Sequence, residues 1–135
     1  MLAGRLAAEG HEPDKLVLLA PGAVIKDACR GGHFFGNTFD PKDPPHHIKC
    51  YGLFKVGREY LTTTQHLDIY GTSAQYQGSV CILHGTNDKM VPLWCSKRYN
   101  TIYKNSILHL IQGEVHTMNK KLSETTSIIQ QFVEQ

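Results

Sequence analysis

The sequence predicts an α/β fold with a parallel sheet of three core strands and flanking helices. Three short apolar runs carry this prediction: LVLLA at residues 16–20, VCILH at 80–84 and ILHLI at 107–111. Such runs are typical of strands that are buried on both faces of a parallel sheet. The strand–helix–strand–helix order of the second half of the chain indicates right-handed crossovers.

Helices are expected after the second and third runs. The first covers residues 92–103, with a proline in its first turn and apolar side chains at Trp94, Tyr99 and Ile102. The second covers residues 117–133, which offer several apolar side chains for burial: Leu122, Ile128, Ile129, Phe132 and Val133.

An earlier helix is expected over residues 1–9, because MLAGRLAAE is rich in alanine and leucine and is ended by Gly10 and Pro13. No Ser, Thr, Asp or Asn precedes it as a capping residue. We therefore expect Met1 to lie within a longer helix and not at the beginning of one.

Residues 28–78 predict an inserted cap or lid. They are rich in glycine, proline and aromatic residues, with Gly31-Gly32 and Pro44-Pro45 among them. At about fifty residues, the segment is too long for an ordinary connection, and long insertions into α/β folds often cover a functional site.

The composition limits the classes of partner. The length of 135 residues indicates one compact domain, and 14 Lys+Arg against 12 Asp+Glu leave a formal net charge of only +2. So small a net charge does not indicate the basic surface that binds nucleic acid. No apolar run approaches the roughly 18 residues that span a bilayer, and the first ten residues lack the apolar segment of a secretory signal. We therefore expect a cytoplasmic protein with no nucleic-acid or membrane partner.

The cysteines and histidines predict neither a metal site nor a cofactor. His46 and His47 are adjacent in a proline-rich segment, and neighbouring positions rarely point at one metal. The sequence contains no HExxH motif. No CxxC pair occurs among the four cysteines, which we expect to be reduced: Cys29, Cys50, Cys81 and Cys95.

Two ionisable residues follow neighbouring predicted strands. Asp88 lies in GTNDKMVP after the run at 80–84, and His116 lies in QGEVH after the run at 107–111. The carboxyl ends of parallel strands meet at one edge of a sheet, so the two residues should lie on adjacent loops. A carboxylate there can accept the Nδ1–H of an imidazole and stabilise the imidazolium that forms during general-base work. The pair would supply two members of a Ser-His-Asp triad.

At these motifs the sequence resembles a known family. HGTNDKMVP, followed by a helix and then LHLIQGEVH, resembles the C-terminal half of an α/β-hydrolase. KLVLLAPGAVIKDA and LDIYGTSAQYQGSVCILHGTND are similar to segments of the bacterial cinnamoyl (feruloyl) esterases, and the resemblance covers nearly all 135 residues. It implies part of one α/β-hydrolase domain over residues 1–135, with the cap at about 28–78, and a serine esterase acting on small-molecule hydroxycinnamoyl or other acyl esters.

The resemblance also implies roles for four residues. Asp88 matches the triad acid and His116 the triad base. Tyr60 matches a cap tyrosine, and Asp27 falls near a cap aspartate, both of which help to bind the phenolic hydroxyls of the substrate. Where the family often has a glutamine, this chain has Phe34-Phe35, and that departure weakens the expectation of a phenolic substrate.

The triad nucleophile is absent from the sequence. In α/β-hydrolases it is a serine in a G-x-S-x-G turn between a strand and a helix, and no such motif occurs in these 135 residues. By the resemblance, the turn would lie a few residues before Met1. We therefore expect the chain to lack both the nucleophile and the oxyanion hole and to be inactive alone.

The resemblance leaves the strand at 16–20 with an open apolar edge, which favours self-association. Two alternatives to the esterase hypothesis remain open. HGTNDKMVP is shared widely, so the first is a generic carboxylesterase or peptidase-like α/β-hydrolase. The second is a stand-alone, non-catalytic α/β domain that binds a partner along its open edge.

Overall fold

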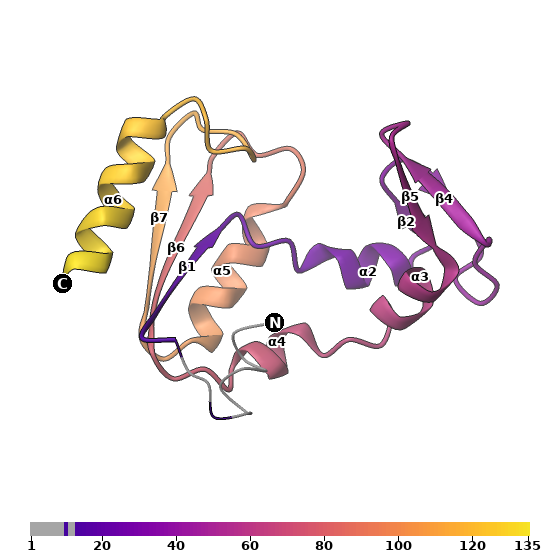
Figure 1. The fold of residues 1–135 in the computed structure, drawn as a ribbon, viewed down its shortest axis with the longest axis horizontal. Helices are drawn as coiled ribbons and strands as arrows, with labels where there is room; N and C mark the ends of the chain where they lie inside the picture. The colour runs from indigo at the N-terminus through magenta and orange to yellow at the C-terminus, as the bar shows by residue number, and fades with distance from the viewer. Residues whose placement is uncertain (1–9, 11–12) are drawn as a thin grey trace. The chain divides into compact units, whose positions relative to one another are not determined.

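The computed structural model describes residue 10 and residues 13–135, and the chain divides into two compact units (Figure 1). The sheet unit comprises Met1–Gly22 and Tyr70–Gln135, and the insertion unit comprises Ala23–Ile69. The helix expected over residues 1–9 lies outside the described residues. No helix in the described ranges combines the length and the hydrophobicity needed to cross a membrane.

The sheet unit is built on three parallel strands, which confirms the predicted fold class. β1 (Lys15–Leu19), β6 (Ser79–Gly85) and β7 (Ser106–Ile111) lie in the order β1–β6–β7. The register places Leu16 of β1 beside Val80 of β6. The arrowheads of all three strands point toward the same edge of the sheet in Figure 1, so the loops that follow β6 and β7 leave from that edge.

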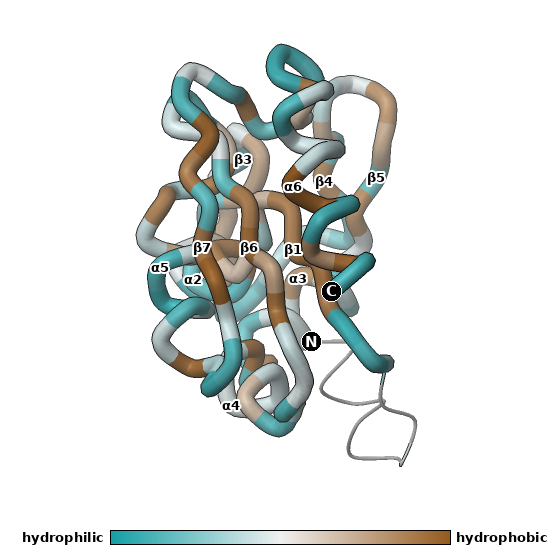
Figure 2. The backbone as a smooth tube through the Cα atoms, turned by 90° about the vertical axis from the view of Figure 1, so that its left-hand side faces the viewer, coloured by the Kyte–Doolittle hydropathy of each residue, from teal (hydrophilic) through white to brown (hydrophobic). Residues whose placement is uncertain are grey.

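The two faces of β6 contact different helices, α5 (Leu93–Ile102) and α6 (Leu122–Glu134). Successive side chains of a strand point to opposite faces. Cys81 and Leu83 belong to the apolar core that packs against α6, whereas His84, one residue further along, bonds to α5. The strands carry much of the hydrophobic colour in Figure 2, as expected for the centre of an α/β layer.

Of the three strands, only β6 is buried on both faces, which corrects the expectation for the other two runs. Six of its seven residues are buried. In contrast, Leu19 of β1 is 47% exposed, and Ile107 and Leu110 of β7 are 55% and 47% exposed. Within the described part of the chain β1 and β7 are the outer strands, so the flanking helices cover them less completely than β6.

The start of α6 differs from the prediction: the helix begins at Leu122, not at residue 117. The carboxylate of the buried Glu114 explains the difference, because it holds the preceding residues in a turn. It accepts three backbone N–H groups, from Val115 at 2.7 Å, Lys120 at 3.2 Å and Lys121 at 2.5 Å. It thereby satisfies amides next to a helix end that has no side-chain cap of its own.

The insertion unit has elements that the sequence did not predict individually, grouped around a small apolar core. Its core side chains come from a helix, two strands and a second helix, and include Phe34, Ile48 and Leu61. A further helix, α4 (Ile69–Ser73), starts at its boundary. The other elements are α2 (Val24–Arg30), β2 (His33–Phe34), β3 (Asn37–Thr38), β4 (His47–Cys50), β5 (Phe54–Gly57) and α3 (Arg58–Thr64).

All four cysteines are buried, and none of them forms a disulfide bond. Cys29 and Cys50 belong to the core of the insertion unit, and Cys81 belongs to the core of the sheet unit. Burial disfavours the thiolate and so raises the pKa of these three thiols. They therefore act as small apolar side chains.

Replacing Glu114 with Gln should destabilise the sheet unit more at neutral pH than in acid. Burial acts to raise the pKa of this carboxyl, but the backbone N–H groups of Val115, Lys121 and Lys120 outweigh burial and hold the pKa below its usual value. A carboxyl with a depressed folded pKa contributes stability above its unfolded pKa of about 4.3, and this stability is lost as the pH falls through the folded pKa. Urea unfolding of both proteins at pH 7 and in acid measures the difference.

The control for this experiment is Glu124→Gln, which neutralises an exposed carboxyl in the first turn of α6. Equal losses of stability in the two variants would contradict the role of Glu114. So would a loss in Glu114→Gln that does not shrink in acid.

The outer edge of β1 should promote self-association. In the part of the chain that the structure describes, β1 pairs with β6 alone, which leaves one row of backbone groups without a strand partner. Light scattering over a concentration series should therefore show a rising mean mass. A monodisperse monomer at the highest concentration would show this expectation to be wrong.

Candidate active site

The loops that follow β6 and β7 are joined through their backbones. The N–H of Thr86 donates to Ile111 O at 3.0 Å, and the N–H of Asn87 donates to Glu114 O at 2.9 Å. Gly85 makes this approach possible, since a Cβ at that position would lie 2.5 Å from the carbonyl carbon of Glu114. Only glycine fits where two backbones come this close.

Asp88 lies on the first loop, where its carboxylate is buried and held by hydrogen bonds. Oδ1 accepts the N–H of Met90 at 2.7 Å and the N–H of Val91 at 2.9 Å. Burial acts to raise the pKa of Asp88, but the N–H of Val91, the ring of His116 and the N–H of Met90 together lower it below the usual value. The carboxylate is therefore ionised at neutral pH.

His116 lies on the second loop and meets this carboxylate. Its Nδ1 is 2.9 Å from Oδ2 of Asp88. Because an ionised carboxylate can only accept, Nδ1 carries a proton, and in the neutral imidazole Nε2 then has the lone pair. The side chain of Asp88 is 0% exposed and that of His116 is 31% exposed, so the imidazole forms the accessible end of the pair. Such a pair can accept a proton from a group that approaches Nε2.

A hollow of about 670 Å³ borders His116. Residues from both loops form its walls: Asn87, Lys89, Met90, Val115, His116, Thr117 and Lys120. His116, the accessible member of the predicted pair, thus borders a space large enough for a small organic group.

The two other predicted site residues, Asp27 and Tyr60, belong to the insertion unit. Asp27 is exposed on α2, and Tyr60 is 44% exposed on α3. The ring of Tyr60 lies 5.9 Å from the ring of Phe34, which in turn lies 4.5 Å from the ring of Phe35. Of the two phenylalanines that depart from the family pattern, Phe34 therefore lies next to Tyr60, and Phe35 lies next to Phe34.

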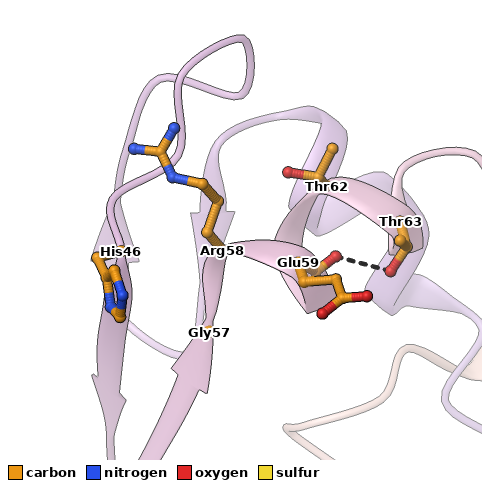
Figure 3. A pocket seen from close by; sticks show the side chains of 6 residues that line it. All are labelled: His46, Gly57, Arg58, Glu59, Thr62 and Thr63. Carbon is orange, nitrogen blue, oxygen red and sulfur yellow. Dashed lines mark hydrogen bonds between the residues drawn. The ribbon is translucent and has the colours of Figure 1, made fainter.

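The histidine pair of the insertion unit lies beside a separate hollow. His46 lines a space of about 570 Å³ together with four residues of α3 and the preceding Gly57 (Figure 3). The ring planes of His46 and His47 are almost perpendicular, with centroids 5.8 Å apart. Among residue 10 and residues 13–135, no group of three His, Cys, Asp or Glu side chains could hold a metal ion.

Sequence reasoning did not assign a role to three buried polar residues of the sheet unit, His84, Ser96 and Glu114. His84 is the last residue of the run at 80–84, and the sequence pattern does not distinguish it from other strand residues. A histidine, a serine and a glutamate at fully buried positions would have been the signal, but only the folded chain shows that they are buried.

Comparison with known proteins gives structural matches alone. No family model matches the chain, and a search of the curated proteins found no match. Est1E from Butyrivibrio proteoclasticus is 27% identical, with a TM-score of 0.89, and the match covers 98% of this chain and 54% of Est1E. A structure of Est1E with ferulic acid bound matches with the same identity, a TM-score of 0.88, and coverage of 98% of this chain and 53% of that one.

A more distant structure shows the same fold. The α/β hydrolase domain-containing protein 10 from mouse is 13% identical, with a TM-score of 0.72, and the match covers 98% of this chain and 57% of the mouse protein. The chain therefore spans about half the length of these matched structures. It has the α/β-hydrolase fold, of which its residues form one part.

Proposed function

We propose that this chain supplies the acid and base of a serine ester hydrolase, with His116 as the general base and Asp88 as the residue that orients it. The observation that carries the proposal is the 2.9 Å hydrogen bond between His116 Nδ1 and Asp88 Oδ2. It lies on the loops that follow two adjacent strands of an α/β-hydrolase fold. In open α/β sheets, functional groups gather at that edge.

In the proposed reaction, Nε2 of His116 takes the proton of a serine hydroxyl while the serine Oγ attacks the ester carbonyl. The resulting imidazolium then gives that proton to the departing alcohol, which leaves an acyl-serine. A water molecule repeats the sequence and releases the carboxylic acid and the free serine. Asp88 stays ionised throughout, because the N–H groups of Met90 and Val91 and the ring of His116 keep its pKa low.

The nucleophile has to come from outside these 135 residues, which contain no G-x-S-x-G motif. We place it, with the oxyanion hole, in the half of the α/β-hydrolase fold that the matched region of Est1E does not include. A general base and the residue that orients it retain little catalytic activity without a nucleophile and an oxyanion hole. The chain by itself is therefore proposed to be inactive.

A hydroxycinnamoyl ester is the proposed substrate class of the whole protein. This rests on the 27% identity to Est1E, a protein that binds ferulic acid in its structure. The insertion unit is the proposed cap, with Asp27 and Tyr60 as its substrate-binding residues. A generic carboxylesterase would share Asp88 and His116, so acyl preference separates the two functions.

Replacing Asp88 with Asn should change the tautomer of His116. The wild-type carboxylate accepts Nδ1–H, whereas an amide can turn its own N–H toward Nδ1 and favour the Nε2–H form. Proton–nitrogen correlation spectra of the imidazole ring measure the ratio of the two tautomers. Asp40→Asn, at an exposed carboxylate that also accepts a backbone N–H, is the matched control and should leave the ratio unchanged. A wild-type His116 in the Nε2–H form would overturn the proposed pairing.

The chain alone should hydrolyse neither p-nitrophenyl acetate nor a feruloyl ester. A polypeptide that joins this chain to the rest of the fold should cleave the feruloyl ester faster than p-nitrophenyl acetate. In that polypeptide, His116→Ala should lower kcat by roughly 10⁴–10⁶-fold. His109→Ala, at a partly buried histidine within β7, is the control. Robust turnover by the 135 residues that His116→Ala abolishes would contradict the missing nucleophile. A preference for the acetyl ester would favour a generic carboxylesterase.

A further inference from the structure

We propose that His84, held by Ser96, is a positioning residue that keeps the carboxylate of Asp88 directed at His116. The inference rests on the proposed function for its chemical meaning, but it concerns residues outside the acid–base pair. All of them lie in the sheet unit, on β6, on α5 and on the loop of residues 86–92, named here the acid loop.

His84 is buried and uses both ring nitrogens. It is the penultimate residue of β6 and is 1% exposed. Nδ1 lies 2.7 Å from Oγ of Ser96 on α5, and Nε2 lies 3.1 Å from the carbonyl oxygen of Val91 on the acid loop. Ser96 is itself 0% exposed. The imidazole therefore connects a helix to the loop through the interior of the sheet unit.

The partners fix where the proton lies. A carbonyl oxygen only accepts, so Nε2 of His84 donates to Val91 O. In the neutral imidazole, Nδ1 then accepts from the hydroxyl of Ser96. Burial lowers the pKa of His84, although the nearby Asp88 carboxylate and the Val91 carbonyl act in the opposite direction.

Val91 transmits the position of His84 to Asp88. Its carbonyl accepts from His84, and its N–H donates to Oδ1 of Asp88 at 2.9 Å. The N–H of Met90 also donates to Oδ1, at 2.7 Å. With Oδ1 occupied by these two amides, Oδ2 is directed at His116. The rotation of the carboxylate therefore depends on a residue that His84 holds in place.

The distance from His84 to Oδ2 suits this role. Nε2 of His84 lies 3.7 Å from Oδ2, which is too far for a hydrogen bond. The N–H of Nε2 is used by Val91 O instead. His84 thus leaves Oδ2 free to accept from His116.

Two substitutions of His84 separate its two bonds. An asparagine amide reaches the place of Nδ1 and can keep the bond to Ser96, but it is too short to reach Val91. A glutamine amide reaches the place of Nε2 and can still donate to Val91. We expect His84→Asn to lower the Nδ1–H to Nε2–H tautomer ratio of His116 by about fivefold, the size of one neutral hydrogen bond, and His84→Gln to restore most of it.

Two measurements keep the test decisive. Ile82→Ala, at a fully buried position of β6, disturbs packing but removes no hydrogen bond to the acid loop, and it should leave the His116 ratio unchanged. In the wild-type chain, the ring of His84 should be in the Nε2–H form, a result that needs no variant to fold. A wild-type ratio at His116 in His84→Asn, or an Nδ1–H form of His84 in the wild type, would overturn the inference. If wild-type His116 is not in the Nδ1–H form, the proposed function fails instead.

Discussion

The close approach of two backbones at Gly85 and Glu114 is the constraint on which the candidate site depends. A side chain at residue 85 would collide with the carbonyl group of Glu114. Without one, the two loops run side by side, and the backbone bonds from Thr86 and Asn87 fix their offset. Asp88 and His116, separated by 28 positions in the chain, thereby lie on neighbouring loops and form their hydrogen bond there. The site is thus a consequence of how two strands of a parallel sheet end.

Two buried carboxylates organise these loops in different ways. Glu114 directs its carboxylate at three backbone N–H groups and so ties the β7 loop to the start of α6. Asp88 commits only one oxygen to the backbone and leaves the second for the imidazole of His116. Both carboxyls have a pKa below its usual value, because backbone N–H groups, joined at Asp88 by the ring of His116, outweigh burial. One carboxylate is therefore structural, and the other has an oxygen available for chemistry.

The sequence was sufficient for those features that depend on local pattern. Apolar runs located β1, β6 and β7, and parallel order placed Asp88 and His116 at the same edge. The sequence did not predict those features of the structure that depend on a contact outside the local pattern. The start of α6 depends on Glu114, which lies before the helix and bonds to it across a turn. The elements of the insertion unit are short, and their pairing is set by a core that no periodicity reveals.

The two-sided nature of β6 also limits the kinds of genetic change that the site can tolerate. Cys81 and Leu83 face an apolar core, while His84 faces the polar partners Ser96 and Val91. A point substitution affects one face at a time. A one-codon deletion within β6 would reverse the faces of the residues beyond it, placing an imidazole in the core and an aliphatic side chain beside the serine. We therefore expect length variation among natural variants to spare β6 and to accumulate in the hairpin turns of the insertion unit.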